Sequence, residues 1–327
     1  MKGRLVEKFL IVILLLVGLN SDISLFGQNL QVMAFWNLEN YFDPFDDELT
    51  ADEEFTPDGE RHWSWKRFVV KRNLISKVLI SMKDSLGDFP VIVGFAEVEN
   101  RFVLEQLVRN TPLVKLGYKV IHYNSADRRG IDVALIYRED FFIPLEQESI
   151  GVSFADSTST RDILRVKGVL KMENCFYRDT VELYVIHFPS KWGSVQQSSQ
   201  RRNTAAKALL DAVGSSDSEN IIVMGDFNDT PDSKIFTLLA EKFYIAGSSG
   251  CYTQKGTIKY KGSWELIDNF LITPQLAQFW KFNIFSSELL LERDSQYLGQ
   301  KPKRTYIGPR YNSGVSDHLP VYIVRKW

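Results

Sequence analysis

SDHLPVYIV, residues 316–324, lies near the end of the chain and joins two titratable side chains to an apolar run. The β-branched residues between Val321 and Val324 predict a strand that is buried on at least one face. Asp317 and His318 stand just before it, where a strand end presents side chains to a cleft. Alone, the pair is also typical of a turn residue beside a core histidine, so its meaning depends on the other strands.

Acid, amide and imidazole groups end or interrupt six apolar runs, at places where a buried core does not call for them. In chain order these residues are Asn37, Glu39, Glu97, Glu99, His187, Asp226, Asn228, Asp268, Asp317 and His318. Each of them alone is typical of a turn, a helix cap or a satisfied core residue. Their concurrence, which includes two of the four histidines, predicts one catalytic cleft at the strand ends.

Strand-like and helix-like patterns alternate along the chain. The strand-like runs are LQVMAFWNL (30–38), FPVIVGFAEV (89–98), IDVALIYR (131–138), VELYVIHF (181–188), NIIVMGDF (220–227), LIDNFLI (266–272) and LPVYIV (319–324). Helical spacing with charged outer faces occurs in WKRFVVKRNLISKVLISMKD (65–84) and SSQRRNTAAKALLDAV (198–213). Several strands with few helices between them predict an α/β sandwich whose sheets form the core.

The composition allows one large folded domain without a strong overall charge. Of the 327 residues, 44% are apolar and 13% aromatic, which is enough to bury a sizeable core. The net charge is −2 and the pI is about 6.2. These values exclude a global positive field that would attract nucleic acid or an anionic membrane, so any affinity for phosphate must be local.

The N-terminal segment is typical of an export signal. Basic residues precede an apolar run from Phe9 to Leu19, which is short for a bilayer span. We expect a signal peptide over residues 1–27, a single domain over 28–327, and a periplasmic or extracellular location. The alternative is an exported protein anchored by an uncleaved N-terminal segment.

Two further features each allow two interpretations. Cys175 and Cys251, the only cysteines, form a disulfide or remain two thiols, because spacing alone does not determine their geometry. The acidic stretch DPFDDELTADEEFTPDGE, Asp43–Glu60, is either a solvated surface insertion or a calcium site, although it lacks the spacing and central glycine of an EF-hand.

The polar residues at the strand ends suit attack on phosphorus. Carboxylates and an amide carbonyl are ligands for Mg²⁺, Mn²⁺ or Ca²⁺, and the lack of a Cys/His cluster in the sequence argues against zinc. A separate carboxylate can take a proton from water, and a histidine paired with an aspartate can bind or protonate the phosphate. The sequence contains no GxSxG, P-loop or GxGxxG motif, which argues against serine hydrolases and nucleotide-binding folds.

The ordered motifs resemble the endonuclease/exonuclease/phosphatase superfamily, which includes pancreatic deoxyribonuclease. GDFND (225–229) and SDHLPV (316–321) are the most specific parts, and they follow WNLEN (36–40) and AEVEN (96–100) in the family order. The resemblance spans about Gln31 to Tyr322. It implies an α/β fold, a four-layer sandwich of two packed mixed β-sheets flanked by helices, with a single catalytic domain.

The resemblance also implies a role for each matching residue. The implied metal shell is Asn37, Glu39, Glu97 and Asp317, with Glu97 as the most direct ligand. The implied catalytic residues are His187, Asp226, Asn228, Asp268 and His318. Asp226 would orient or deprotonate the attacking water and Asn228 would hold it, while His187 would contact the phosphate. Asp268 would pair with His318, which stabilises the phosphorus centre or assists the leaving oxygen.

Four further residues are candidate substrate contacts. Arg129 and Arg165 lie in segments that resemble cleft-lining segments of the family, although Arg165 is equally typical of a solvated strand position. Arg304 and Tyr306 belong to QKPKRTYIGPRYNSG, which interleaves basic and aromatic residues. Such a segment can hold a phosphate backbone or stack a base, and the alternative is an ordinary polar loop.

Together these features predict a metal-dependent phosphodiester hydrolase that uses Mg²⁺ or Mn²⁺, with Ca²⁺ as an alternative. We expect a secreted or periplasmic nuclease that acts on nucleic acid as a monomer without an obligate protein partner. The alternatives are hydrolysis of a phosphoinositide, sphingomyelin or another small phosphate ester, and a non-catalytic binding module. Many relatives have Gln in place of Ala96 and His in place of Asn269, which limits the transfer of a substrate from any one branch.

Overall fold

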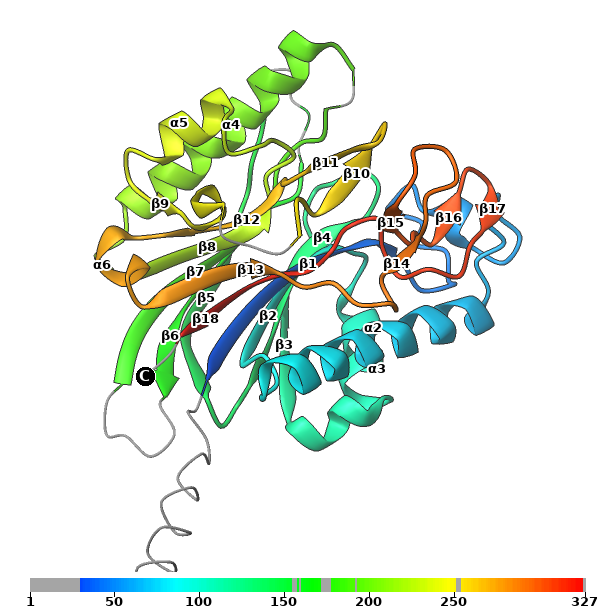
Figure 1. Ribbon diagram of the computed structural model, residues 1–327, viewed down its shortest axis with the longest axis horizontal. Coiled ribbons are helices and arrows are strands. Elements are labelled where there is room, and N and C mark those ends of the chain that lie inside the picture. Colours follow the sequence, from blue (N-terminus) through cyan, green and yellow to red (C-terminus); the bar gives the residue numbers. More distant parts are fainter. Residues whose placement is uncertain are drawn as a thin grey trace, which may run out of the picture.

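The computed structural model describes residues 30–154, 158, 160–171, 178–191, 193–250 and 254–325 (Figure 1). The expected signal peptide over 1–27 lies outside the described residues, and so do Cys175 and Cys251. Export and the disulfide therefore stay predictions.

Two six-stranded sheets form the centre of the molecule. The first has the order β13 (Trp280–Ile284), β18 (Val321–Arg325), β1 (Gln31–Tyr41), β2 (Ile92–Val98), β4 (Asp132–Arg138) and β3 (Tyr118–His122). The second has the order β5 (Phe142–Ile150), β6 (Ile163–Lys171), β7 (Arg178–His187), β8 (Ile221–Asp226), β12 (Asp268–Ile272) and β9 (Tyr244–Ile245). Both sheets are mixed, because β1 and β2 are parallel, as are β7 and β8, whereas the other pairs are antiparallel.

Helices cover the outer faces of both sheets (Figure 1). The α-helices are α2 (Trp65–Leu86), α3 (Arg101–Arg109), α4 (Val195–Gly214), α5 (Lys234–Leu239) and α6 (Pro274–Ala277), and short 3-10 turns occupy Glu53–Phe55, Pro112–Leu116 and Ala246–Ser249. The first two helices lie on the first sheet, and α4 and α5 lie on the second. The expected four-layer sandwich is therefore confirmed.

The sheets approach each other closely where β2 crosses β8. A Cβ atom at Gly94 would lie 2.7 Å from the Met224 sulfur atom, so a side chain there would push the sheets apart. The larger apolar core fills the space between the sheets and the space under α2 and α3. A smaller core, which includes Leu209 and Phe236, packs under α4 and α5.

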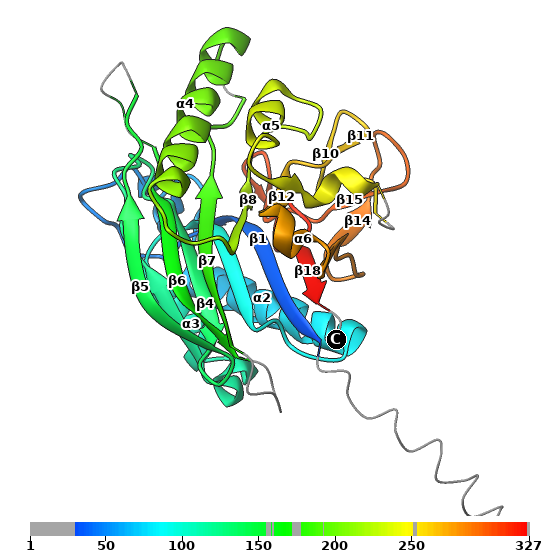
Figure 2. The same cartoon turned by 90° about the vertical axis from the view of Figure 1, so that its left-hand side faces the viewer.

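The remaining short strands do not belong to the two six-stranded sheets and pair as hairpins. Three hairpins occupy one end of the sandwich: β10 (Ile258–Tyr260) with β11 (Ser263–Glu265), β14 (Leu291–Arg293) with β15 (Gln300–Pro302), and β16 (Tyr306–Ile307) with β17 (Arg310–Tyr311). Figure 2 shows β5, β6 and β7 side by side in one curved layer, with α4 outside it.

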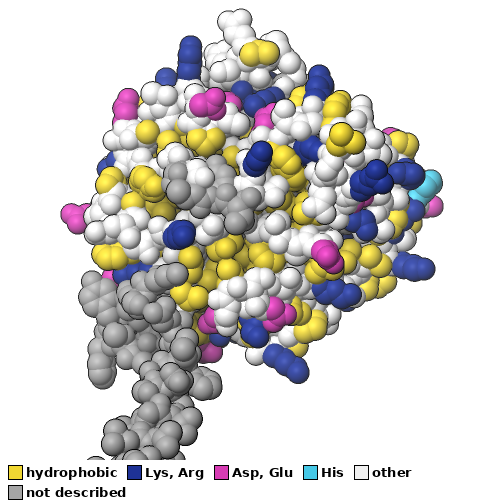
Figure 3. All heavy atoms as spheres, in the orientation of Figure 1, with side chains coloured by type: hydrophobic (Ala, Val, Ile, Leu, Met, Phe, Trp, Pro, Cys, Tyr) yellow, Lys and Arg dark blue, Asp and Glu magenta, His cyan; other side chains and the backbone are white. Residues whose placement is uncertain are grey.

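On the face in Figure 3, acidic and basic side chains are interspersed, as the small net charge implies. None of the helices in the described part of the chain is both long and apolar enough to span a bilayer.

The acidic segment 43–60 lies at the surface with most of its carboxylates exposed, and a few buried residues anchor it. Phe42 and Phe55 stack with ring centroids 4.4 Å apart, and Asp43 and Asp52 are buried. Glu99 accepts a hydrogen bond from the backbone of Asp43, and burial together with the Asp43 charge raises the pKa of Glu99 to about 9. Within the described residues, no three carboxylate or imidazole groups of this segment converge as a metal site does.

Candidate active site

Three neighbouring strands of the second sheet carry polar residues that the ladder places side by side. β7 and β8 align His187 with Asp226, and β8 and β12 align Asp226 with Asp268. Paired residues point to the same face of a sheet. This is the inner face, because Val185, two residues before His187, belongs to the core between the sheets. The three side chains therefore meet where the gap between the sheets opens.

His318 is fixed by the segment that precedes β18. The Ser316 hydroxyl accepts a hydrogen bond from the His318 backbone N–H at 2.9 Å and donates to the Asn37 carbonyl at 2.6 Å. The Trp36 indole N–H donates to the His318 carbonyl at 2.9 Å. His318 Nδ1 lies 2.8 Å and 3.1 Å from the two carboxylate oxygens of Asp268. These contacts set the ring orientation, and the expected Asp268–His318 pair is present.

The two histidines of the site have opposite electrostatic environments. Burial opposes the charged form of His318, but the carboxylates of Asp268 and Asp226 outweigh burial and raise its pKa well above the ordinary value. Burial lowers the pKa of His187 well below the ordinary value, and the guanidinium groups of Arg161 and Arg129 add to this effect. Near neutral pH, His318 is therefore cationic and His187 is neutral. Such divergence between neighbouring groups is typical of separate catalytic roles.

The Asp226 carboxylate is hydrogen-bonded to groups on both sides of the gap between the sheets. Its Oδ1 accepts from the Asn228 backbone N–H at 2.8 Å, and its Oδ2 accepts from the Asn37 side chain of the first sheet at 3.0 Å. Burial, followed by repulsion from Asp268, raises the pKa of Asp226 to about 7. A carboxylate with such a pKa can accept a proton from water near neutral pH and release it again.

A bulge in β2 brings Glu97 to the opposite side of the gap. The ladder shifts register at this residue, and Glu97 has a left-handed backbone with φ of 59°. The Asn37 amide donates to its Oε1 at 3.3 Å, and the Asn40 backbone N–H donates to its Oε2 at 2.9 Å. Glu39, Asn40 and Asn228 also have positive φ. Each such non-glycine conformation costs about 1–3 kcal/mol, and strain of this kind concentrates at functional sites.

Glu39 is held in a network behind the cleft rather than directly in it. Its carboxylate accepts from Arg304 Nε at 2.8 Å and from the Thr305 backbone N–H at 2.7 Å. The buried Lys71 ammonium donates to the Glu39 carbonyl at 2.5 Å. Burial and the nearby Asp317 raise the pKa of Glu39 to about 7, although Arg304 opposes this shift. Arg304 also bridges to Asp317 at 2.9 Å.

The oxygen-rich side of the gap fits a divalent cation. Glu97 and Asp317 line the gap with carboxylate oxygens, which hard cations prefer. Asn37 turns its amide nitrogen toward Glu97 and Asp226, and its oxygen accepts from the Glu39 backbone N–H at 2.9 Å. The role of Asn37, Glu39, Glu97 and Asp317 as a metal shell stays a prediction.

A second group of potential ligands also converges. Asp226, Asp268 and His318 each place one ligand atom within 4.8 Å of the others. However, His318 Nδ1 is already hydrogen-bonded to Asp268, so only Nε2 of that ring faces away from the pair. This arrangement suits proton transfer better than metal binding, and the identity of the metal stays a prediction.

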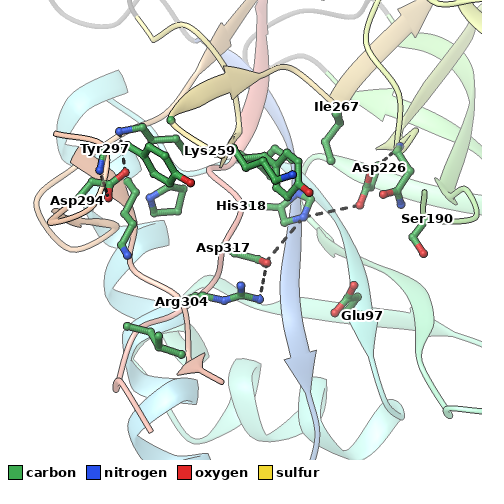
Figure 4. Close-up of a pocket in the computed structure, with 18 of the residues that line it drawn as sticks. Glu97, Ser190, Asp226, Lys259, Ile267, Asp294, Tyr297, Arg304, Asp317 and His318 are labelled. Atoms are coloured by element: carbon green, nitrogen blue, oxygen red, sulfur yellow. Dashed lines mark hydrogen bonds and ion pairs between the residues drawn. The ribbon is translucent and has the colours of Figure 1, made fainter. Parts of the chain in front are cut away.

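A cavity of about 480 Å³ opens over these groups (Figure 4). Its catalytic wall is lined by Glu97, His187, Asp226, Asn228, Asp317 and His318. Its outer wall comes from loops and hairpins and includes Arg129, Arg161, Ser190, Lys259, Tyr260, Tyr297 and Arg304. In Figure 4, Ser190 and Tyr297 lie at opposite ends, with His318 between them. Asn37, Glu39 and Asp268 support the lining residues from behind through the contacts described above.

The structure corrects two of the expected substrate contacts. Arg165 lines a different cavity, beside α4, where its guanidinium bonds to Glu182, Glu148 and Glu146. Tyr306 is buried, packs against the Trp63 ring, and donates its hydroxyl hydrogen to the Arg61 carbonyl. Arg129 and Arg304 do line the catalytic cavity, and Arg304 is half-exposed there.

Sequence reasoning did not single out Lys71, Lys259 or Tyr297. Lys71 lies on the apolar face of α2 with Phe68 and Ile75, where a buried ammonium is unusual, and this was the signal available. Lys259 and Tyr297 carry no comparable signal, because neither lies in a strongly periodic stretch.

Comparison with known proteins agrees with this architecture. A family model described as "Endonuclease/Exonuclease/phosphatase family" matches residues 32–326. No curated protein matches the sequence significantly. An endonuclease/exonuclease/phosphatase of Bacteroides vulgatus is 15% identical, with a TM-score of 0.57, and the match covers 91% of this chain and 100% of that chain.

Two other structures have named activities or ligands. The mannosyl-6-phosphatase of Bacteroides thetaiotaomicron VPI-5482 is 16% identical, with a TM-score of 0.55 and coverage of 90% of this chain and 98% of that one. D. rerio TDP2, solved with a single-strand DNA product, is 15% identical, with a TM-score of 0.51 and coverage of 90% and 98%. At such identities these structures establish the fold alone. The family match over nearly the whole folded chain shows that the protein belongs to the endonuclease/exonuclease/phosphatase family, whose members are metal-dependent phosphoric ester hydrolases.

Proposed function

We propose that the protein is a metal-dependent phosphodiesterase that cleaves nucleic acid, and therefore a nuclease. The observation that carries this proposal is the alignment of His187, Asp226 and Asp268 across three strands, with His318 paired to Asp268. This row of groups faces the oxygen ligands around Glu97 across one cavity. A phosphate in that cavity would contact a base, an acid and a cation site at once.

Different residues of the chain carry out the separate steps of hydrolysis. Asp226, with its pKa near neutrality, accepts the proton of the attacking water, and Asn228 beside it orients that water. Neutral His187 can donate an N–H to a phosphoryl oxygen, and cationic His318 stabilises the phosphorus centre or protonates the leaving oxygen. A divalent ion held by Glu97, with Glu39, Asn37 and Asp317 around it, would polarise the phosphoryl group; Mg²⁺ or Mn²⁺ suits these ligands, with Ca²⁺ as the alternative.

The outer wall of the cavity supports nucleic acid as the substrate. Lys261, Tyr260 and Tyr297 combine positive charge with aromatic surface, and the Lys261 ammonium lies 5.2 Å from the centre of the Tyr260 ring. Such walls bind strands by backbone contacts and by stacking of bases. The single-strand DNA product of the similar D. rerio TDP2 supports the same choice. Because the similar protein from Bacteroides thetaiotaomicron is a mannosyl-6-phosphatase, a small sugar phosphate is the second candidate substrate.

Location and assembly complete the proposal. The basic and apolar N-terminal segment supports export to the periplasm or beyond, or anchoring by that segment if it is not cleaved. The catalytic groups of the cavity all come from one chain, which supports a monomer without an obligate protein partner.

A substrate panel tests the function. The chain from residue 28 is assayed on single-stranded DNA, RNA, plasmid DNA, bis(4-nitrophenyl) phosphate, a phosphoinositide, sphingomyelin and mannose 6-phosphate. We expect the highest kcat/KM on a nucleic acid, complete loss in EDTA, and recovery with Mg²⁺ or Mn²⁺. Turnover of a phosphomonoester or a lipid without cleavage of nucleic acid would overturn the nuclease proposal, and full activity in EDTA would overturn the metal requirement.

A further inference from the structure

A second cavity of about 460 Å³ adjoins the catalytic one. The residues that line it include Arg129, Phe154, Thr160, Arg161, Ser190 and Arg201. Arg129, Arg161 and Ser190 also line the catalytic cavity, so the two spaces share a wall. In Figure 4, Ser190 lies beyond Asp226, at the end opposite Tyr297. Ser190 is therefore at the end of the catalytic cavity that adjoins the second one.

The shared wall has more positive than negative charge. Asp127 lies 3.2 Å from Arg161 Nη1 and 3.8 Å from Arg129 Nε, so these two guanidinium groups share one carboxylate. Arg161 is almost fully buried, and among the described residues its Nε has no hydrogen-bond acceptor. Two cations against one anion leave a local positive charge that an anionic ligand would compensate.

The arginines are connected to the catalytic residues. Arg161 Nη2 donates to the Phe188 carbonyl at 3.3 Å, and the Asn228 side chain donates to the same carbonyl at 2.9 Å. The Arg129 backbone N–H donates to Asp127 Oδ1 at 3.0 Å, which fixes the turn that carries it. The charges of both arginines also contribute to the low pKa of His187. A group bound in the second cavity would therefore have a fixed position relative to the scissile phosphate.

The far wall of the second cavity is aromatic and basic. The Arg201 guanidinium lies 5.4 Å from the centre of the Phe154 ring. Arg201 projects from α4 and is absent from the lining of the catalytic cavity. This position separates the two cavities experimentally, because a change at Arg201 alters the second cavity without touching the catalytic wall.

We propose that the second cavity is an anion subsite that binds a phosphate flanking the scissile one. The inference rests on the proposed function and deepens it, because it names a substrate with at least two phosphates joined by a short linker. On a nucleic acid strand, the neighbouring backbone phosphate occupies the subsite, and a guanidinium donates hydrogen bonds to its oxygens.

Dinucleotides with and without a flanking phosphate test the subsite. The ligands are TpT, pTpT and TpTp, which place the extra phosphate on neither side, the 5′ side or the 3′ side. Wild type should show about tenfold higher kcat/KM for one phosphorylated form than for TpT, mainly through a lower KM. In Arg201→Gln this preference should fall toward unity while kcat/KM for TpT changes by less than about twofold.

Lys207→Gln is the matched control, because Lys207 is an exposed cation on the same helix. This control should keep the full preference, which separates a bound phosphate from general attraction of charge. Equal kcat/KM for all three ligands in wild type would refute the subsite, and so would an equal loss of preference in both variants. A uniform loss on all ligands in Arg201→Gln would also refute it, because it would indicate a structural role.

Calorimetric titration of the Asp226→Asn variant separates the subsite from the nuclease proposal, because it needs no turnover. If one phosphorylated dinucleotide binds about tenfold more tightly than TpT, the subsite stands even where wild type cleaves no dinucleotide. In that case only the nuclease proposal fails. Equal Kd values for the three ligands would overturn the subsite itself.

Discussion

The two walls of the catalytic cavity are built in different ways. On the catalytic wall, His187 and Asp226 are buried, and continuous strand ladders align them with Asp268 behind the wall. On the outer wall, Tyr260 and Tyr297 come from short hairpins and turns and are largely exposed. The catalytic groups are thus on strands, whose pairing in the sheets fixes their positions. The groups that select the substrate are on loops, which can change in sequence with little loss of stability.

The outer wall is nevertheless held by specific contacts. The Lys259 ammonium lies 2.9 Å from Asp294 and donates to the Leu298 carbonyl at 2.7 Å. Gly262 has φ of 87° at the tip of the β10–β11 hairpin, and a Cβ atom there would lie 3.1 Å from Tyr297. These contacts tie the hairpin to the turn before β15. The difference between the walls therefore predicts loss of turnover from changes in one and loss of affinity from changes in the other.

The largest effect should come from Asp226→Asn. We expect kcat to fall by about 10²–10⁴-fold, because the amide cannot accept the proton of water. The melting temperature should stay equal or rise, since the substitution removes a buried charge that Asp268 repels. Asp232→Asn, a change in an exposed loop six residues later, is the control and should leave both values unchanged. A melting temperature that falls together with kcat would assign Asp226 a structural role instead.

Asp268→Asn should have the next largest effect. The variant keeps the shape of the pair but removes the charge that raises the pKa of His318, so we expect kcat to fall by about 10–10²-fold. The sign of the pH effect follows directly. A lower pKa means that His318 loses its proton at lower pH, so the alkaline limb of the rate profile should move to lower pH. An unchanged limb in a full pH profile would show that His318 does not act as the cation.

On the outer wall, Asp294→Asn should act mainly on KM. The substitution leaves the buried Lys259 without its carboxylate and loosens the hairpin, so we expect KM to rise by about fivefold, or about 1 kcal/mol, with kcat nearly unchanged. Arg293→Gln removes the exposed neighbouring charge and serves as the control. Steady-state kinetics on single-stranded DNA measure both. A fall in kcat without a change in KM would mean that the two walls are not functionally separate.

The difference between the two walls also explains which parts of the structure could be predicted from the sequence. Polar residues at the ends of apolar runs predicted the catalytic wall, because strand ends are constrained by burial. The register that aligns His187 with Asp226 could not be predicted, since it depends on pairing between distant strands. Tyr306 was assigned to the cleft because loops have no periodicity that tells an inward from an outward aromatic ring. Here that ring packs against Trp63.

The smallest effect on activity should come from Arg165→Met. Arg165 lies in β6, and its guanidinium bonds to the buried Glu182 on β7, away from both cavities of the site. We expect unchanged kcat and KM and a loss of about 1–3 kcal/mol in stability, because Glu182 would lose its charged partner. Burial opposes ionisation of Glu182, but the hydrogen bonds from Arg165 and Tyr184 lower its pKa, so this stabilisation is present above the unfolded pKa. The stability difference from wild type should therefore shrink as the pH falls through the carboxylate range. A changed KM in this variant would show that Arg165 contacts the substrate after all. Residues of this sheet could then not be divided into those that stabilise the fold and those that act in the cleft.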